Sequence, residues 1–304
     1  MIANSAAAIV AFRPEPEALL ALARQAKAQA ALVFVFANSE LDTDLAEALR
    51  AADVELIAAP INVGLGEAFN QLAEAAAGAG MRRLLLLDQD SEIPPGFIAA
   101  LADAADALTA RGEKPAVVGP RIVSPPGSNY KAPRYFSRGG IAPLKGAQAV
   151  HYVISSGSLV DLEALNEVGA FRADFFIDAI DTEWCFRAWS RGRSCWVEND
   201  VSMLHRIGQG TLRTLGAGVP RQPDFRLYAF ARNQAHCLTL AHVPLAWKLR
   251  FFLHVGRVTL ASWAARNYRL GFAAMMAQAF FRGLGGELGP PPGVENIAIA
   301  AGES

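Results

Sequence analysis

Two carboxylates separated by one residue follow the most apolar short segment of the chain. Asp88 and Asp90 come directly after Leu84–Leu87, four leucines in a row. An aliphatic run this short predicts a strand that is buried on both faces, as in a parallel sheet. Ligands of open α/β sheets bind beyond the carboxyl ends of the strands. Hard oxygen ligands there suit Mg²⁺ or Mn²⁺ carrying phosphate groups, although a D-x-D sequence alone is more typical of a solvated loop.

A second acidic group lies among aromatic residues further along the chain. Asp178 and Asp181 are three residues apart, so they share a face if a helix has begun there. Phe175, Phe176 and Trp184 surround them in sequence. Partial burial would raise the pKa of a carboxyl group and make a usable general base. The alternative is that Asp181 caps a helix, while Glu183 pairs in solvent with Arg187 at the next turn.

Two weaker signals accompany the acids. His205 precedes a polar turn rather than an apolar face, so a metal role stays open beside that of an ordinary structural histidine. Asn62, Gly64 and Asn70 belong to a turn and the helix it opens, whose backbone amides suit a phosphate or a sugar edge. Asn-Val-Gly is also found in ordinary turns, and the pattern alone does not decide.

The elements that must position these residues alternate between strand and helix. This alternation predicts an α/β fold with a doubly wound, mostly parallel sheet. The predicted strands are 6–12, 32–36, 54–58, 84–87 and 116–119, and the predicted helices are 16–30, 42–52, 67–77 and 94–110.

The pattern is looser after residue 120. Residues 120–150 contain five Pro and four Gly and predict a loop or irregular ribbon. We expect strands over 151–156 and 194–197, helices over 161–167 and 181–191, and one long helical segment over 244–282. These elements divide the chain into a catalytic domain over 1–240, with parts 1–120 and 121–240, a basic helical extension over 241–286 and a flexible tail over 287–304.

The charge of the chain is strongly divided along its length. Residues 1–200 hold 17 Lys and Arg against 25 Asp and Glu, whereas residues 201–286 hold 11 against Asp224 alone. Between Phe225 and Arg282 the basic residues alternate with aromatic ones. Such segments are typical of helices that lie on anionic membrane surfaces, or of helices packed on the domain or in a dimer. The acidic remainder of the chain makes nucleic acid a poor partner.

The compartment follows from the cysteines and the apolar runs. Cys185, Cys195 and Cys237 are an odd number without C-x-x-C spacing, which argues against a disulfide framework or a zinc site. No signal peptide and no uncharged run of about 18 residues is visible. We therefore expect a cytoplasmic location, with peripheral attachment to the inner face of the cell membrane as an open alternative.

The order of these motifs resembles the inverting glycosyltransferases of family 2, which have the GT-A fold, and most closely their bacterial rhamnosyltransferase branch. The resemblance covers about 9–237. It rests on five blocks in order, which are Leu87–Ser91, Ile154–Leu159, Phe176–Trp184, His205–Gly208 and Arg232–Asn233.

The resemblance implies a role for each motif. Asp181 would be the base that deprotonates the acceptor hydroxyl, and Asp88, Asp90 and His205 would hold Mg²⁺ or Mn²⁺. The substrates would be a nucleotide-sugar, with dTDP-rhamnose favoured, and a glycan or lipid-linked acceptor in polysaccharide synthesis. The implied donor-side residues are Asn62, Gly64, Asn70, Asp88, Gln89, Asp90 and Arg206, and the implied acceptor-side residues are Gly157, Asp178, Glu183 and Trp184.

Two departures concern the donor. Ala37 stands where such enzymes usually have an Asp that contacts the base, and Phe69 stands where relatives often carry Arg or Gln. Two other classes stay open at this point, a nucleotidyltransferase and a non-catalytic scaffold that binds glycan or lipid. The segment 12–16 has one Arg and no Gly, whereas a nucleotidyltransferase usually has a Gly-rich basic loop after its first strand.

Overall fold

A computed structural model describes residues 2–124, 132–204, 211–214 and 217–294. Its first half is a parallel sheet in the strand order β3-β2-β1-β4. Two of the helices begin at an aspartate that caps them, namely α2 and α5 (Leu162–Val168). Asp42, for example, accepts the backbone N–H of Asp44 at 2.9 Å at the start of α2. The elements are β1 (Ile2–Ala11), α1 (Pro16–Lys27), β2 (Ala30–Ala37), α2 (Thr43–Ala51), β3 (Glu55–Ala58), α3 (Gly64–Gly78), β4 (Arg83–Asp88) and α4 (Phe97–Ala110).

The second half completes a mixed sheet with the order β3-β2-β1-β4-β7-β5-β8-β6. β7 is antiparallel to both β4 and β5, whereas β5 and β8 are parallel. An eight-stranded sheet with this alternation confirms the predicted α/β class. The remaining elements of this half are β5 (Pro115–Val123), β6 (Ala147–Ala149), β7 (Ser158–Asp161), α5 (Leu162–Val168), the 3₁₀ turn η1 (Ala173–Phe175), α6 (Ile180–Ser190) and β8 (Ser194–Leu204).

One predicted strand is wrong, because residues 151–156 are irregular and the strand begins at Ser158. A tight turn explains the shift. The N–H of Ser158 bonds to the carbonyl of Ser155, and Gly157 has a φ of +76°. The N–H of Gly157 then bonds to the carbonyl of Leu86, so the turn lies against the last residues of β4.

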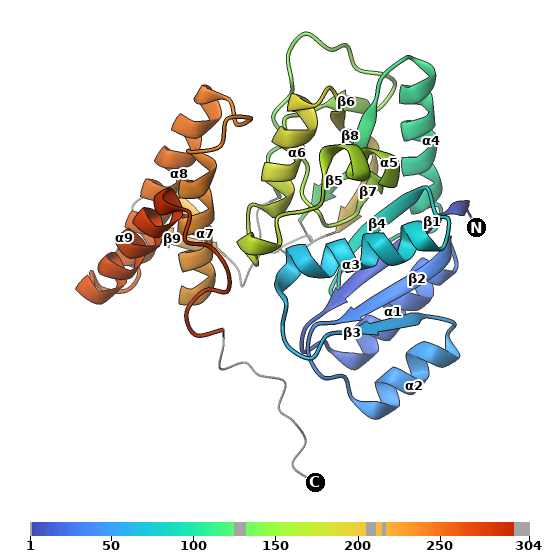
Figure 1. The fold of residues 1–304 in the computed structure, drawn as a ribbon, viewed down its shortest axis with the longest axis horizontal. Helices are drawn as coiled ribbons and strands as arrows, with labels where there is room; N and C mark the ends of the chain where they lie inside the picture. The colour runs from blue at the N-terminus through green and yellow to red at the C-terminus, as the bar shows by residue number, and fades with distance from the viewer. Residues whose placement is uncertain (1, 125–131, 205–210, 215–216, 295–304) are drawn as a thin grey trace.

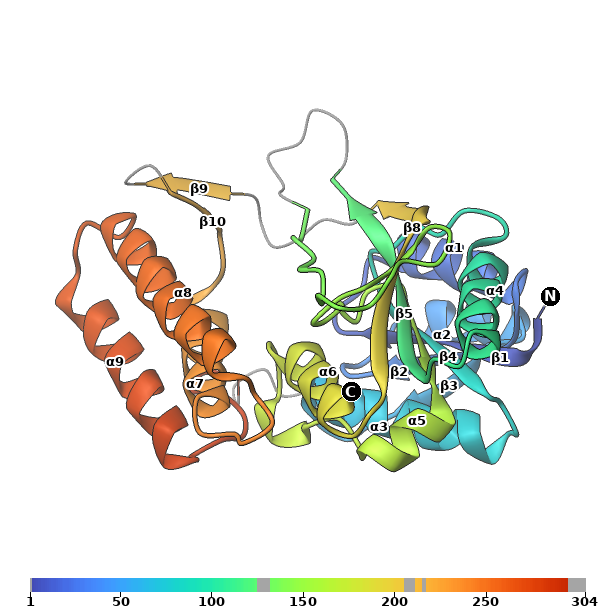
Figure 2. The same cartoon turned by 90° about the horizontal axis from the view of Figure 1, so that it is seen from above.

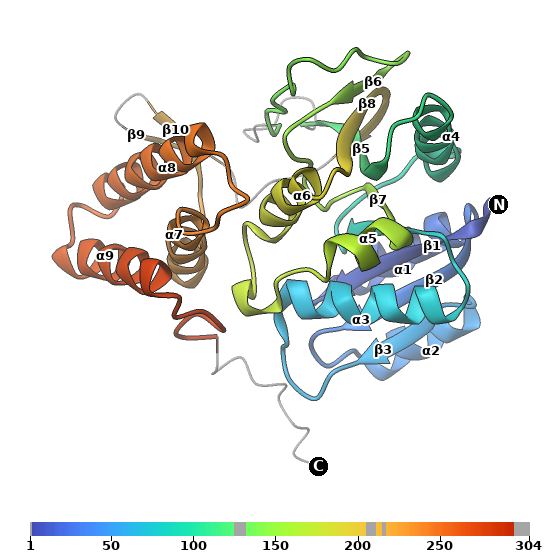
Figure 3. The same cartoon turned by 45° about the horizontal axis from the view of Figure 1, so that its top comes forward.

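The four leucines of β4 are buried on both faces of the sheet, as predicted. Leu84 and Leu86 belong to the core under α3, α5 and α6, while Leu85 and Leu87 belong to the core under α1, α2 and α4. Figure 3 shows α3, α5 and α6 along one face of the sheet, with α1 and α2 behind it.

Three helices follow the sheet domain and lie beside α6 (Figure 1). They are α7 (Asp224–Cys237), α8 (Leu245–Ala264) and α9 (Leu270–Gly285). α7, which is not among the predicted helices, packs against both α8 and α9. The helical segment predicted over 244–282 is present but divided in two, because the chain turns at Asn267 and Tyr268, which both have positive φ. Figure 2 shows the ribbon of β9 (Thr211–Thr214) and β10 (Ala217–Pro220) beside α8.

The three helices are joined to the sheet domain by an aromatic cluster. Trp247 of α8 lies between Phe136, Tyr152 and Phe186, with ring centroids 5.2, 5.5 and 5.3 Å away. Such pairs bury large apolar area and fix ring orientation. Within the residues that the structure describes, no helix is long and apolar enough to cross a membrane.

Candidate active site

The first acidic segment lies where β4 ends. The carboxylate of Asp88 accepts a hydrogen bond from the hydroxyl of Ser156, and Asp90 is exposed two residues later. Between them, Gln89 joins the ends of β4 and β1. Its Oε1 accepts the N–H of Phe12 at 2.6 Å, and its Nε2 donates to the Phe12 carbonyl at 3.2 Å. Gln89 could contact a nucleotide-sugar through its amide only if it gave up these two hydrogen bonds.

The donor set at this strand end has the chemistry that Mg²⁺ and Mn²⁺ prefer, namely carboxylate oxygens beside an accessible position. Within the described parts of the chain, no group of three or more His, Cys, Asp or Glu lies close enough to hold a metal ion. His205 and Arg206 lie outside the described residues. The metal set of Asp88, Asp90 and His205 therefore stays a prediction.

The second acidic segment begins α6, and its Asp181 is held by its own turn and by a neighbouring loop. Oδ1 of Asp181 accepts the N–H and the hydroxyl of Thr182 at 2.7 and 3.2 Å, and Oδ2 accepts the N–H of Ser155 at 3.0 Å. Burial raises the pKa of Asp181, against the opposing effect of these hydrogen bonds. A carboxyl with a raised pKa is a better proton acceptor.

The two acidic segments meet through two adjacent serines. Ser155 donates its N–H to Asp181, while the next residue, Ser156, donates its hydroxyl to Asp88. Ser156 is buried, so this link is internal to the domain. The structure therefore brings Asp88 and Asp181, which are 93 positions apart in sequence, to one short segment before β7.

The turn that leads into α6 contains three non-glycine residues with positive φ. Phe176, Asp178 and Ala179 have φ values of 63°, 66° and 65°. A positive φ is uncommon for residues other than glycine, and it persists only where the surrounding structure imposes it. The N–H of Leu65, at the start of α3, bonds to the carbonyl of Phe176 at 2.6 Å and is one such constraint.

A second constraint on this turn comes from α7. The side-chain amide of Asn233 donates to the carbonyls of Phe175, Ile177 and Asp178 at 2.9, 2.7 and 3.0 Å. The neighbouring Arg232 donates to the Phe175 carbonyl at 3.2 Å. The Arg-Asn pair that contributed to the family resemblance therefore supports the backbone of the second acidic segment.

Arg226 is a site residue that the sequence analysis missed. Its guanidinium lies 3.2 to 3.3 Å from the carboxylate oxygens of Asp178. The pKa of Arg226 is raised, mainly by the Asp178 carboxylate, and Asp88 and Asp181 add to the same effect. Arg226 and Asn233 are seven residues apart on α7, which places them on one face. That spacing from the Arg-Asn motif is the signal that could have identified Arg226.

Glu183 and Trp184 lie in the interior. Glu183 is 1% exposed, with both oxygens bound by Arg187 and with His242 Nε2 2.9 Å from Oε1. The predicted pair with Arg187 is confirmed, but in a buried setting rather than in solvent. Trp184 is also buried, and its indole N–H donates to the Gly169 carbonyl at 2.9 Å. An acceptor could reach neither side chain without opening the core.

The turn before α3 has the geometry that its sequence predicts. Asn62 Oδ1 accepts the N–H of Gly64 at 2.9 Å, and Gly64 has a φ of +80°. A Cβ on Gly64 would lie 2.6 Å from the ring of Phe176, so only glycine permits this contact with the second acidic segment. The structure begins α3 at Gly64, earlier than the predicted residue 67.

Two further predicted residues serve the packing of the site. Asn70 exchanges two hydrogen bonds with the backbone of Phe171, at 2.9 and 2.8 Å, so its amide holds the loop before η1. A Cβ on Gly157 would lie 2.8 Å from the sulfur of Met203. Asn70 therefore uses its amide within the protein, and Gly157, next to Ser156, has no side chain to present to a ligand.

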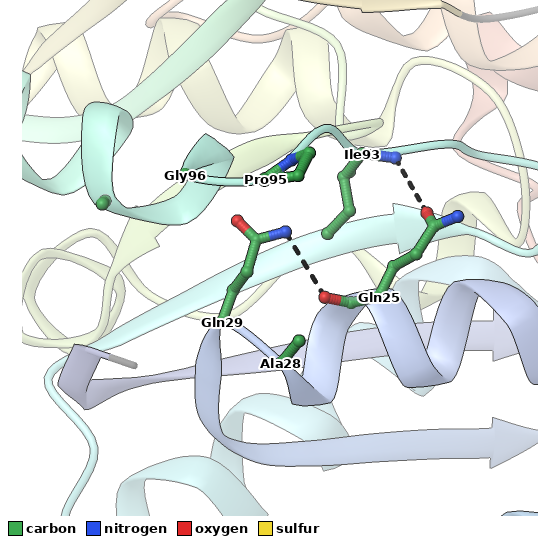
Figure 4. Close-up of a pocket in the computed structure, with 7 residues that line it drawn as sticks. Gln25, Ala28, Gln29, Ile93, Pro95 and Gly96 are labelled. Carbon is green, nitrogen blue, oxygen red and sulfur yellow. Dashed lines mark hydrogen bonds between the residues drawn. The ribbon is translucent and has the colours of Figure 1, made fainter.

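A hollow without acidic residues lies elsewhere on the molecule (Figure 4). It has a volume of about 500 Å³ and lies between α1 and the start of α4. Gln25 and Gln29 bond across it to the backbone of Ile93, Pro94 and Ile98. The residues that line it include no acid, base or nucleophile. It therefore offers no catalytic group and is separate from the acidic site.

Comparisons with known proteins show the family to which the chain belongs. The family model described as Glycosyl transferase family 2 matches residues 8–169, more than half of the chain. A relative from Shigella flexneri, the dTDP-rhamnosyl transferase RfbF, is 30% identical over 263 residues, which cover 82% of this chain and 85% of that protein.

Solved structures share the fold. S. aureus TarS has a TM-score of 0.59 at 15% identity over 97% of this chain and 50% of that one. GalNAc-T7 with UDP, GalNAc and Mn²⁺ has a TM-score of 0.57 at 13% identity over 84% and 54%. The chain thus spans about half the length of these two proteins. TarS 1-349 in complex with UDP-GlcNAc has a TM-score of 0.54 at 16% identity over 97% and 84%.

Proposed function

Because the chain belongs to glycosyl transferase family 2, and is therefore a glycosyltransferase with a GT-A-type fold, we propose that it transfers L-rhamnose from dTDP-L-rhamnose with inversion. The acceptor would be a hydroxyl of a glycan or lipid-linked acceptor in cell-surface polysaccharide synthesis. The identity to a dTDP-rhamnosyl transferase supports the donor. The observation that carries the reaction type is the junction at Ser155 and Ser156, which brings a carboxyl with a raised pKa beside the acid at the end of β4.

Asp181 is the base of the proposed mechanism. Its carboxylate accepts the proton of the acceptor hydroxyl as that oxygen attacks the anomeric carbon, and the bond from that carbon to the diphosphate breaks on the opposite face. The hydrogen bonds from Ser155 and Thr182 fix the carboxylate, so that little reorganisation is needed at the moment of transfer.

The donor side rests on the end of β4. Asp88 and Asp90, with His205, would hold Mg²⁺ or Mn²⁺, and such an ion neutralises the charge of a leaving diphosphate. A GT-A-fold structure that carries UDP and Mn²⁺ supports this proposal. Arg206 would contact the donor from the segment after β8. Gly64 and Asn62 would keep the turn before α3 close to the donor.

The donor assignment is tested by a screen of nucleotide sugars. Purified protein is incubated with Mn²⁺ and dTDP-rhamnose, dTDP-glucose, UDP-glucose or UDP-GlcNAc, and thermal unfolding is followed with each. A ligand that binds only the folded state raises the unfolding temperature. We expect the largest rise with dTDP-rhamnose and release of dTDP on addition of acceptor glycan. A larger rise with a UDP-sugar would overturn the donor while leaving the reaction type.

We also propose that α8 attaches the enzyme peripherally to an anionic membrane surface. One face of α8 packs on the protein through Trp247, Phe251 and Val255. The opposite face is exposed and apolar, and Arg257 is exposed near it. An interfacial helix of this kind binds through its apolar face, and each basic group near the surface adds about 1 kcal/mol. The exposed apolar residues of α8 are Leu245, Leu249, Phe252, Leu253 and Leu260.

Flotation with liposomes tests the attachment. The protein should float with vesicles containing phosphatidylglycerol at low salt, and less so at high salt. Phe252→Ser with Leu253→Ser should stay at the bottom, whereas Ile61→Ser, at an exposed apolar residue of the sheet domain, should not matter. Absence of flotation together with a dimer in solution would assign the apolar face of α8 to a second copy of the chain.

A further inference from the structure

The second acidic segment has a strained backbone conformation, and side chains of α7 supply many of the contacts that maintain it. Three residues with positive φ occur within four positions, and Asn233 binds the carbonyls of Phe175, Ile177 and Asp178 in the same stretch. Arg226 lies two helical turns earlier on the same face of α7, and it binds the carboxylate of Asp178 through both Nε and Nη2. α7 therefore binds both the backbone of this turn and the side chain of Asp178.

The charge around Arg226 is as informative as its contacts. Besides Asp178, the acids Asp88 and Asp181 act on the guanidinium from β4 and α6. A site built from carboxylates repels a diphosphate unless positive charge offsets them. Arg226 is only partly exposed, with 35% of its side chain accessible, so its charge is screened less than that of a surface arginine.

We propose that Arg226 is a positioning residue of the donor site, whose charge offsets Asp178 and its neighbouring acids so that the site accepts a diphosphate. This inference rests on the proposed function, because it needs a nucleotide diphosphate as the ligand. Without Arg226, the carboxylate of Asp178 adds one uncompensated negative charge to the site. The loss of donor affinity then arises from Asp178, and removal of that carboxylate should restore it.

The test is a double-mutant cycle between the two residues. Arg226→Gln should weaken binding of dTDP about tenfold, measured by calorimetry in the presence of Mn²⁺, since one charge in partly buried surroundings has an effect of this order. Asp178→Asn in the Arg226→Gln background should recover most of that loss. The matched control is Arg266→Gln, which breaks the exposed pair with Asp224 at the start of the same helix and should leave dTDP affinity unchanged.

Two results would overturn the inference. One is an Arg226→Gln protein that binds dTDP as tightly as the wild type. The other is a double variant that binds no better than Arg226→Gln, since Arg226 would then act only through the fold. If Arg226→Gln does not fold, Asp178→Asn alone decides the matter. It leaves Arg226 uncompensated and should tighten dTDP binding severalfold, and unchanged binding would refute the proposal.

The series separates this inference from the proposed donor. It is run with whichever of dTDP and UDP the wild-type protein binds more tightly, because the diphosphate is common to both. A preference for UDP counts against dTDP-rhamnose as the donor and leaves the role of Arg226 to be decided by the cycle.

Discussion

The two acidic segments reach one site by different physical routes. Asp88 ends a regular strand, and the pairing of β4 with β1 and β7 sets its position. Asp178 and Asp181 instead flank the start of α6 on a turn with three positive φ angles, which α3 and α7 hold from outside. The first acid is therefore positioned by strand pairing, and the second acidic segment by backbone and side-chain contacts from distant parts of the chain. Substitutions in the two segments should therefore change catalysis, ligand affinity and stability in different ways.

The largest effect is expected from removing the metal at the first segment. EDTA should abolish transfer, and Mg²⁺ or Mn²⁺ should restore it. Asp90→Ala should lose about 10²-fold or more in kcat while its unfolding temperature stays within a degree or two, because Asp90 is exposed and surface changes cost little stability. The matched control is Asp103→Ala on the exposed face of α4. Full activity in EDTA would remove the metal from the mechanism.

The next effect concerns the base of the second segment. Asp181→Asn should cut kcat by roughly 10²-fold, the usual scale of general-base loss, and leave dTDP affinity unchanged. Burial raises the pKa of Asp181, so wild-type kcat should fall as the pH drops through this raised pKa. The residual activity of Asp181→Asn should lack that fall. A near wild-type rate would instead assign the base to another carboxylate.

A smaller effect should come from the support of the turn. Asn233→Ala removes three hydrogen bonds to backbone carbonyls and leaves buried groups unpaired, at about 1–3 kcal/mol of stability. We expect kcat to fall about tenfold with dTDP affinity maintained, because Asp181 loses its fixed position while β4 is untouched. Asn199→Ala removes one side-chain bond to the Gly146 carbonyl and serves as the control. Equal losses in both variants would mean that the turn needs no support from α7.

The difference between the two routes also explains what the sequence could predict. The aliphatic run of β4 and the alternation of helices and strands over 1–119 depend on local patterns, and both are confirmed. The strand expected over 151–156 is wrong because Gly157 introduces a turn against Leu86, which no local period reveals. Periodicity likewise does not show that the long C-terminal helix divides at Asn267 and Tyr268.

The site shows the same division. Residue types and order predict roles for Asp88, Asp90 and Asp181, but Arg226 meets Asp178 only because α7 packs against the turn before α6. The burial of Glu183 was missed for a related reason. His242, 59 residues later, completes its surroundings, and only tertiary structure brings the two together.

Glu183 should give the smallest effect on catalysis, although it lies two residues from the base. Glu183→Gln should leave kcat within about twofold and lower the free energy of unfolding by about 3 kcal/mol, because it leaves the Arg187 guanidinium without its buried counter-charge. Burial alone would raise the pKa of Glu183, but His242 and Arg187 outweigh it and lower the pKa below its usual value of 4.5.

The stability that Glu183 contributes therefore has a defined pH range. Its folded pKa is depressed, so the contribution is complete above the unfolded pKa of about 4.5 and is lost as the pH falls through the lower folded value. Urea unfolding of the wild type and of Glu183→Gln between pH 7 and pH 3 measures this, and the difference between the two should shrink towards the acidic end. Glu167→Gln is the control, since Glu167 pairs with Arg193 at the surface. If Glu183→Gln kept full stability but lost catalysis, Glu183 rather than Asp181 would carry the chemistry of this segment.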